Sequence, residues 1–358
     1  MGVIRNLLDN INQASEKSPL IGKFHPVFKA MDDFFYGTDK VTDIPHILDH
    51  IDIKRFMSAV IIGLIPATIA AIYFWGWRIF LVILVSYIFG GLVEVAFAIV
   101  RKQGIHEGFL VTGLIFPLTL PPTIPLWMVA VGVMFGVFFG KEVFGGTGRN
   151  PFNPALVGRI FLSIAFPGMM SAQWMLPFTS GLGGFLHYQT SVDALAGATP
   201  LNLYRGTGTI TSYLDLFLGH SPGCIGETFR IGLITGGVFL ILARIINWRL
   251  PLSFLLSVII FSFIGNQFAP EKFAPPLFQL LSGGLLLGAF FMATDPVTCP
   301  YTRAGKWIGG ITAGLLVTLI RGLSGYVEGV MFSIILLNIF SPLIDHLVLN
   351  IKYPRIVK

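Results

Sequence analysis

Ten apolar runs divide the sequence, and a chain with this much apolar surface to shield cannot fold as an ordinary water-soluble domain. A helix needs about 20 residues to cross the hydrocarbon core of a bilayer, which is roughly 30 Å thick. Several runs are shorter. Residues 109–120 would extend only about 18 Å as a helix, so this element is predicted to be broken or re-entrant. The runs are residues 56–75, 79–100, 109–120, 126–140, 155–170, 229–246, 250–268, 277–293, 307–320 and 330–349.

Composition supports a membrane protein and excludes other classes. Of the 358 residues, 54% are hydrophobic and 12% are charged, whereas soluble domains carry about twice that share of charge. A soluble enzyme, a nucleic-acid-binding protein and a disordered chain are therefore excluded. Cys224 and Cys299 have no second Cys or His at ligand spacing, so no metal site is predicted. Residues 1–55 are polar and lack the basic-then-apolar start of a cleaved signal peptide.

The distribution of Lys and Arg predicts the orientation of the chain in the membrane. With the N-terminus in the cytoplasm, the inner segments carry 18 Lys and Arg residues, the outer loops carry five, and Arg159 lies within a span. Basic residues accumulate on the cytoplasmic side of membrane proteins. Both termini are therefore predicted to be cytoplasmic, and the long connection 171–228 is predicted to be extracytoplasmic.

A short internal repeat indicates how the spans are organised. Residues 116–123 and 291–298 match at Phe, Thr, Pro and Thr with one offset of 175 residues. An accidental match is the alternative. Because each half has five spans, the second half must enter the membrane in the opposite sense, as in transporters with inverted repeats. We therefore expect an all-α integral membrane protein of about ten transmembrane helices, arranged as two inverted five-helix repeats with interrupted third helices. The expected parts are a cytoplasmic segment 1–55, a repeat 56–170, the loop 171–228, a repeat 229–349 and a cytoplasmic tail 350–358.

The extracytoplasmic connection contains a run of small residues before a threonine. Gly197 and Ala198 would let a flat, bulky group approach the backbone of Thr199, and a hydroxyl in a loop can form an ester. Judged by residue types alone, however, the segment is more typical of a plain turn with Pro200 after the threonine.

The loop 141–154 is rich in glycine and asparagine. Asn153 before Pro154 predicts a helix N-cap followed by proline in the first turn. Gly145 and Gly146 would allow close approach of a ligand. No Gly-Lys-Ser/Thr follows, so a phosphate-binding loop is rejected. Asn-Pro-Ala is also typical of water channels, but their fold needs a second copy and the sequence has none.

Acidic residues in or near spans are costly and are functional candidates by default. Glu94, Asp295 and Asp345 could each coordinate Na⁺ or take up a proton, with Thr119, Thr294 and unpaired carbonyl groups completing a cation site. The alternative is that these carboxylates pair with Arg159 or Lys141, or cap helix ends.

Several segments together carry a family resemblance. They resemble the family formed by the B subunits of sodium-translocating NADH:quinone reductases and the D subunits of Rnf ferredoxin:NAD oxidoreductases. The polar N-terminal extension favours the quinone reductase branch, although the connection 76–78 is shorter than in its better-known members. The segments are residues 100–109, 120–127, 141–150, 193–201, 291–296 and 342–346.

The resemblance implies a covalent flavin in the extracytoplasmic loop. In this family FMN is joined by a phosphoester to the threonine of a motif that residues 193–201 match. On that basis Thr199 carries FMN, Gly197 and Ala198 belong to the motif, and Asp193 occupies the acidic position that the flavin transferase reads. Ala196 departs from the usual serine, which concerns the efficiency of the modification.

The resemblance also implies further ligands. In the family the region of loop 141–154 binds a non-covalent riboflavin, so Asn150 and Asn153 become candidates for its polar edge, with Gly145 and Gly146 beside it. Gly90 and Gly91 lie in a segment that is similar to the family's quinone site.

The implied function is that of one membrane subunit of a six-subunit redox complex in the bacterial inner membrane. Such a subunit would pass electrons from FMN through riboflavin to ubiquinone, coupled to Na⁺ translocation. No dinucleotide fingerprint is present, so other subunits must supply the electrons. The alternatives are an Rnf-type subunit and, in a different class, a cofactor-free channel of the urea or ammonium type.

Overall fold

The computed structural model describes residues 53–101, 108–171, 174–179, 181, 184–185, 198–326 and 328–354. The predicted cytoplasmic segment 1–55 therefore lies almost wholly outside the described residues, as does most of the connection 171–197. Within the described residues the chain is helical and contains no strand, which confirms the all-α class.

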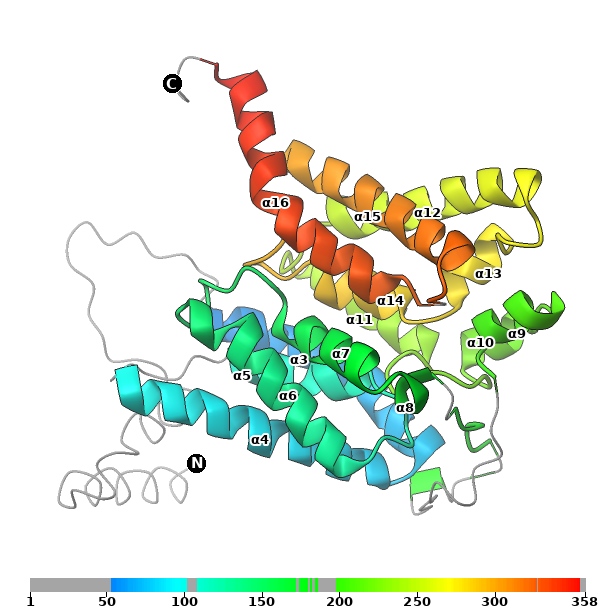
Figure 1. Cartoon of the computed structure of the whole chain (residues 1–358), viewed down its shortest axis with the longest axis horizontal. Helices are drawn as coiled ribbons and strands as arrows, with labels where there is room; N and C mark the ends of the chain where they lie inside the picture. Colours follow the sequence, from blue (N-terminus) through cyan, green and yellow to red (C-terminus); the bar gives the residue numbers. More distant parts are fainter. Residues whose placement is uncertain are drawn as a thin grey trace.

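The first half of the chain forms one group of helices, in blue to green in Figure 1. Its third member, α5, is short, and its fifth member is followed, after Phe166, by a second short helix. The helices are α3 (Ile53–Trp75), α4 (Arg78–Arg101), α5 (Gly108–Leu118), α6 (Leu126–Gly140), the 3₁₀ turn η2 (Glu142–Phe144), α7 (Pro154–Ala165) and α8 (Pro167–Ser171).

The second half forms a second group, in yellow to red in Figure 1. Two short helices of the long connection precede it. Its third member is broken into two α-helical pieces and a π-helical turn. The elements are α9 (Pro200–Thr207), α10 (Tyr213–Leu218), α11 (Arg230–Leu242), α12 (Arg249–Phe268), α13 (Pro276–Leu281), α14 (Leu285–Leu287), η4 (Gly288–Met292), α15 (Arg303–Leu323) and α16 (Val330–Lys352).

The described residues do not contain ten continuous spans. Six helices are long and apolar enough to cross a membrane, and α5, α7 and α11 are shorter apolar helices. The predicted span 277–293 is divided at residues 282–284, and the predicted span 155–170 is divided at Phe166. The six long segments are Arg55–Trp75, Arg78–Arg101, Leu126–Phe144, Arg249–Phe268, Arg303–Leu323 and Val330–Lys352.

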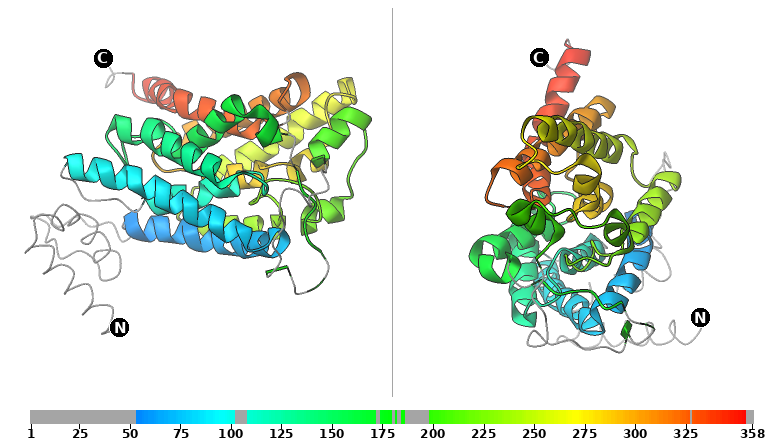
Figure 2. Two further views of the ribbon diagram at one scale, coloured as in Figure 1. Left: turned by 60° about the horizontal axis from the view of Figure 1, so that its bottom comes forward. Right: turned by 90° about the vertical axis from the view of Figure 1, so that its right-hand side faces the viewer.

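The helix pairings in the second half follow those in the first. In the first half α4 packs on α5 and α6, and α6 packs on α7. In the second half α12 packs on α13 and α15, and α15 packs on α16. The first helices of the two halves, α3 and α11, pack against each other, and the last helices, α7 and α16, are also in contact. The views in Figure 2 show these helices as one bundle.

Small residues permit the closest of these pairings. A Cβ atom on Gly136 of α6 would lie 2.4 Å from the carbonyl oxygen of Pro154, and one on Gly158 of α7 would lie 2.5 Å from the carbonyl oxygen of Gly132. Between α12 and α15, Ser257 donates to the carbonyl oxygen of Gly310. Close approach of backbones at small residues is a common way for helices to associate in lipid, where water exclusion provides no driving force.

Candidate functional site

Two cavities lie at opposite ends of α7. The first, which we call the Thr199 cavity, has a volume of about 420 Å³ and touches the C-terminal half of that helix. The second, the Asn153 cavity, has a volume of about 50 Å³ and touches the first residues of the same helix. The Thr199 cavity is lined by Arg159, Ser163, Pro167, Met170, Ser171, Trp174, Thr199, Asn202, Gly325, Tyr326, Glu328 and Met331.

Thr199 is the N-cap of α9. Its side-chain oxygen accepts a hydrogen bond from the backbone N–H of Asn202 at 3.3 Å, and Pro200 occupies the first helical position. This is a long bond, so the cap holds the threonine without using its hydroxyl fully. Leu201 is buried and anchors the start of the helix. The hydroxyl is thereby fixed at the wall of the cavity and half-buried.

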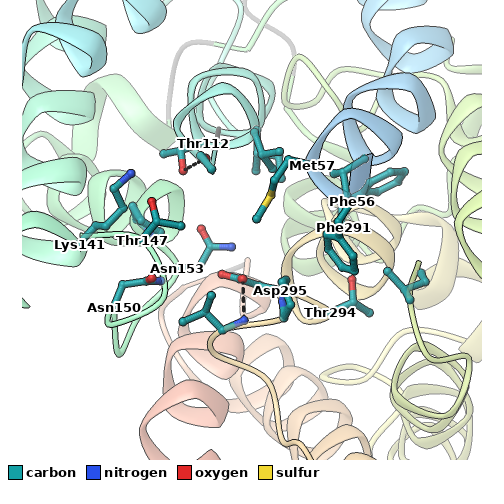
Figure 3. Close-up of a pocket in the computed structure, with 18 of the residues that line it drawn as sticks. Phe56, Met57, Thr112, Lys141, Thr147, Asn150, Asn153, Phe291, Thr294 and Asp295 are labelled. Carbon is teal, nitrogen blue, oxygen red and sulfur yellow. Dashed lines mark hydrogen bonds between the residues drawn. The ribbon is translucent and has the colours of Figure 1, made fainter. Parts of the chain in front are cut away.

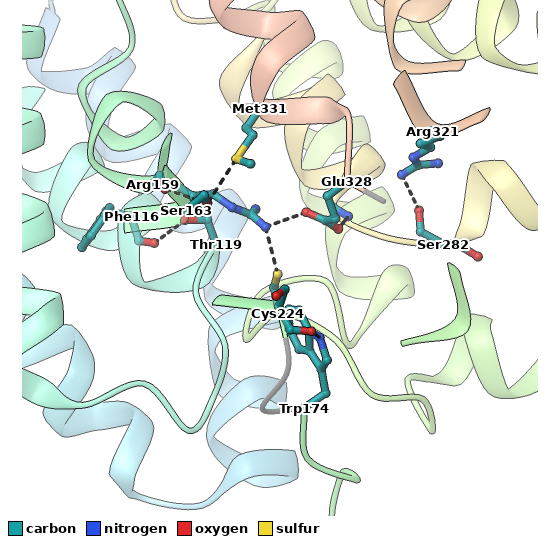
Figure 4. A network of polar contacts seen from close by, with 12 residues as sticks. Phe116, Thr119, Arg159, Ser163, Trp174, Cys224, Ser282, Arg321, Glu328 and Met331 are labelled. Atoms are coloured by element: carbon teal, nitrogen blue, oxygen red, sulfur yellow. Dashed lines mark hydrogen bonds and ion pairs between the residues drawn. The ribbon is translucent and has the colours of Figure 1, made fainter. Parts of the chain in front are cut away.

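Arg159 lies at the centre of a polar network behind this cavity (Figure 4). Its Nη2 donates to Oε2 of Glu328 at 2.5 Å and contacts Sγ of Cys224 at 3.4 Å. Oε1 of Glu328 accepts from the backbone N–H of Gly284 at 3.1 Å. The network thus joins α7 to the segment before α16 and to the break in the third helix of the second half.

Two further arginines close the end of α13. Arg230 donates from Nε to the carbonyl oxygen of Leu281 at 2.9 Å. Arg321 donates to the carbonyl oxygens of Gln279 and Ser282, at 2.7 and 2.8 Å. These carbonyl groups are released where the helix is interrupted, and cations at a helix C-terminus satisfy them and oppose the helix dipole.

Glu227 is buried next to this network. Its Oε2 has no hydrogen-bond partner among the described residues, and its carboxylate, that of Glu328 and the thiol of Cys224 lie within 4.8 Å of one another. Burial raises the pKa of Glu227 to about 8, and the negative charge of Glu328 adds to the rise. Burial also raises the pKa of Cys224. Although burial acts in the other direction, Arg159 and Arg321 hold the pKa of Glu328 below its ordinary value.

The carbonyl groups in and next to the first copy of the internal repeat, residues 116–123, are paired as well. The backbone N–H groups of Ile225 and Gly226 donate to Leu120 and Leu118, at 2.9 and 2.7 Å. Arg78 donates to the carbonyl oxygens of Pro122, Thr123 and Ile124. Thr119 belongs to the network of Figure 4, whereas Thr294 lines the Asn153 cavity. The structure therefore does not bring the two threonines together in one cation site.

The Asn153 cavity is formed by α3, α5, the loop after η2, the start of α7 and the segment around η4 (Figure 3). Asn153 is the predicted N-cap, since its Oδ1 accepts from the N–H of Ala155 at 3.0 Å. Asn150 donates to the carbonyl oxygen of Phe152 and accepts from the N–H of Gly148. Both asparagines line the cavity while holding the loop. The hydroxyl of Thr147 is buried in the same wall and has no hydrogen-bond partner within the described part of the chain.

Two of the three predicted acidic residues lie near this cavity. Asp295 lines it, and Oδ1 of Asp295 accepts from the N–H of Val297 at 3.1 Å. Glu94 of α4 forms an ion pair with Lys141, which also lines the cavity. Glu142, next in the chain, pairs with Arg101 at 2.7 Å. Glu94 therefore adopts the pairing that was the alternative to ion binding.

Asp345 has a different environment. Its two carboxylate oxygens accept from the backbone N–H groups of Tyr301 and Thr302, at 2.6 and 3.0 Å, and from the hydroxyl of Thr302 at 2.6 Å. Thr302 is the N-cap of α15. Asp345 thus stabilises the start of α15, which was the other alternative for the acidic residues.

Four predicted site glycines have roles in backbone conformation and helix packing. Gly145 and Gly146 have φ angles of 115° and 93°, a conformation that side chains disfavour. The ring of Phe109 would lie 3.2 Å from a Cβ atom on Gly91, and Val133 would lie 3.1 Å from one on Gly90. Gly90 and Gly91 therefore let α4 approach its neighbours.

Some predicted site residues lie outside the described residues, and some residues of the site were not predicted from the sequence. Asp193 and Gly197 lie outside the described residues, and Ala198 is exposed next to Thr199. Sequence reasoning missed Glu227 and Glu328, which lie outside the apolar runs, and it left Arg159 without an assigned partner. The available signal was the presence of one basic residue, Arg159, within an apolar span.

The fold and the cavities define an α-helical membrane protein with a cavity lined by Thr199 and by the ion pair of Arg159 and Glu328. The chain belongs to the NQR2, RnfD, RnfE family, whose model matches residues 40–353. Three similar proteins are named as the B subunit of a Na(+)-translocating NADH-quinone reductase. They come from Pseudomonas paraeruginosa strain PA7 (38% identical, covering 98% of both chains), Azotobacter vinelandii strain DJ (37%, covering 99% of this chain and 98% of the relative) and Yersinia pestis (34%, covering 98% of both).

Proposed function

We propose that this chain is the B-type membrane subunit of a sodium-translocating NADH:quinone reductase. The full-length similarity to proteins of that name and the six apolar spans support this function. The observation that carries it is the position of Thr199, whose hydroxyl caps α9 at the wall of a ligand-sized cavity. The subunit would lie in the bacterial inner membrane with both termini cytoplasmic and Thr199 extracytoplasmic. The matching helix pairings support its division into two five-helix repeats.

The residues around Thr199 fit a flavin. A volume of about 420 Å³ lies within the range of roughly 300–1,000 Å³ that is typical of small-molecule sites. Trp174 and Tyr326 supply aromatic surface, and Arg159 supplies a cationic side chain at the wall. In this proposal the hydroxyl of Thr199 carries FMN as a phosphoester, in the motif with Asp193, Gly197 and Ala198. Bound FMN supplies one-electron and two-electron redox chemistry.

The Asn153 cavity does not fit riboflavin in this conformation. About 50 Å³ is well below the volume of typical ligand sites, although Thr147, Asn150 and Asn153 offer suitable polar groups. Riboflavin binding here is therefore proposed from the family alone, and no electron-transfer step is assigned to it. The same volume suits a partly hydrated Na⁺, because one water needs only about 10–15 Å³.

Sodium coupling is proposed at the Asn153 cavity. The carboxylate of Asp295 and the side chain of Thr294 are hard oxygen ligands that face the same space. Glu94 could coordinate Na⁺ only after its ion pair with Lys141 breaks, because the ammonium group of Lys141 now neutralises its carboxylate. Asp345 would affect sodium coupling indirectly, by holding the start of α15 in place. We also propose that ubiquinone is reduced near Gly90 and Gly91. The chain would assemble with the other subunits of a six-subunit complex.

The attachment of flavin is the decisive test. The chain is produced with its flavin transferase and partner subunits and run on a denaturing gel. Flavin fluorescence is expected at the position of this polypeptide, and Thr199→Ala should abolish it. Thr207→Ala, at the other end of α9, is the matched control and should retain it. An intact mass equal to that of the bare polypeptide in the wild-type complex would refute the proposal.

An Rnf-type subunit is the second candidate, because the matching family model includes RnfD. It would keep the flavin on Thr199 but exchange electrons between ferredoxin and NAD. Quinone reduction by the purified complex distinguishes the two. A cofactor-free channel would give no fluorescence at all in the gel experiment.

A further inference from the structure

Arg159 is the arginine that reaches the Thr199 cavity. It lies halfway along α7, its side chain is 8% exposed, and it lines the cavity together with Thr199 and Trp174. Arg230 and Arg321 belong to the same charge network but do not line this cavity, and they are occupied by the carbonyl groups at the end of α13. The geometry therefore distinguishes one guanidinium from the other two.

The hydrogen bonds of Arg159 are incomplete. Nη2 is shared between Glu328 and Cys224, whereas Nε is buried and has no partner in the described ranges of the chain. A buried donor without an acceptor loses the hydrogen bond that water would give it, so native proteins rarely retain one without a reason. Arg159 also lines the cavity, so its guanidinium group has capacity to interact with a ligand there in addition to Glu328 and Cys224.

The charge of Arg159 is balanced by one carboxylate among the described residues. Glu328 provides it and lines the same cavity, with 18% of its side chain exposed. Burial raises the pKa of Glu227, which lies behind the pair, and so favours its protonated form. Arg159 and Glu328 are the charged side chains among the described residues that line the cavity, so Arg159 can be shared between Glu328 and an anionic ligand.

We propose that Arg159 is the residue that stabilises negative charge on a flavin in the Thr199 cavity, with Glu328 as its counter-ion. This inference rests on the proposed function. With FMN bound, a one-electron donor in a partner subunit would be oxidised by one electron and the cavity would gain one negative charge, while Arg159 would keep its proton. No bond in the protein forms or breaks. A fixed cation beside the ring system favours the reduced state, and a fixed anion opposes it.

The test measures the midpoint potential of this flavin in the purified complex. The relevant transition in a spectroelectrochemical titration is the one that disappears in Thr199→Ala. Arg159→Gln should shift its potential to a more negative value, Glu328→Gln should shift it to a more positive value, and Arg159→Lys should restore part of the loss. Arg303→Gln, at an exposed arginine that does not line the cavity, is the control and should leave the potential unchanged.

The possible results distinguish failure of the proposed function from failure of the inference about Arg159. A wild-type complex without flavin on this chain would refute the proposed function and the inference together. Flavin present in Arg159→Gln at the wild-type potential would overturn the inference alone. Shifts of the same sign in Arg159→Gln and Glu328→Gln would indicate a merely structural role and would also overturn it. If Arg159→Gln does not fold, Glu328→Gln decides: a positive shift supports the inference, and no shift or a negative one overturns it.

Discussion

Lys141, the residue after α6, forms an ion pair with Glu94 of α4, and both side chains are almost completely buried. Taking two charges out of water is expensive, and their attraction compensates for that cost only while both are present. The pair connects the end of α6 to the C-terminal part of α4 directly beside the Asn153 cavity.

Removing one member of this pair should destabilise the protein strongly. Lys141→Met leaves the Glu94 carboxylate buried without its cation, and we expect a loss of about 3–5 kcal/mol. The double variant Glu94→Gln with Lys141→Met should recover most of this loss. Thermal unfolding in detergent measures both, with the exposed Lys272→Met as control. Equal stability of Lys141→Met and the wild type would show that the pair contributes nothing.

The contact between α6 and α7 should not tolerate a methyl group. A Cβ on Gly136 would meet backbone atoms of Pro154 and Gly158 at 2.4 and 2.8 Å, and backbone cannot rotate away as a side chain can. Gly136→Ala should therefore cost at least about 1–3 kcal/mol. Gly168→Ala is the control, because no described atom lies within 4 Å of its Cβ position. Equal unfolding temperatures for the two variants would contradict this packing.

Asp345 should affect stability more than sodium dependence. Its carboxylate accepts three hydrogen bonds at the start of α15. Asp345→Ala should cost about 1–2 kcal/mol, and Asp345→Asn less, because an amide oxygen remains as an acceptor. The Na⁺ concentration for half-maximal quinone reduction should change little in Asp345→Asn. A large increase in that concentration at unchanged stability would instead assign Asp345 to ion binding.

Glu227 should make the stability depend on pH. Its pKa rises from 4.5 to about 8 on folding, chiefly through burial, so the folded state favours the protonated carboxyl group. This contribution is fully present below pH 4.5 and is lost as the pH rises toward 8, by about 1.4 kcal/mol for each unit crossed. Glu328, Arg159, Arg230 and Cys224 face the same carboxyl group.

The matching experiment compares two variants over this pH range. Relative to the wild type, Glu227→Gln should gain thermal stability between pH 5 and 8, with no further gain above that range. Glu271→Gln, at an exposed carboxylate, should follow the wild type throughout. Parallel curves for Glu227→Gln and the wild type would mean that Glu227 is ionised in the folded protein.

Local signals predicted the elements well where hydrophobic runs and caps agree. The run 126–140 coincides with α6, and Asn153 before Pro154 is the N-cap of α7. The predicted break in the third helix of the second half is present at residues 282–284, although its position required the structure. Apolar composition continues across Phe166, so the division between α7 and α8 left no hydropathy signal.

The candidate site was predictable only in part. Thr199 and Asn153 were identified by motif, and the structure adds that they line cavities at opposite ends of α7. The Arg159–Glu328 pair joins residues 169 positions apart, and no local pattern encodes such a distance. The pairing of Glu94 with Lys141 was one of the stated alternatives, and only the packing of α4 against α6 selects it.

The shortness of α7 has an electrical consequence. Its 12 residues rise about 18 Å, against roughly 30 Å of hydrocarbon, and each of its ends touches a cavity with polar walls. With both cavities filled by water from opposite sides of the membrane, the voltage would fall mainly across the thin partition between them. A charge moved along this helix would therefore work against most of the voltage, about 2.3 kcal/mol per 100 mV, within little more than half the thickness of the bilayer.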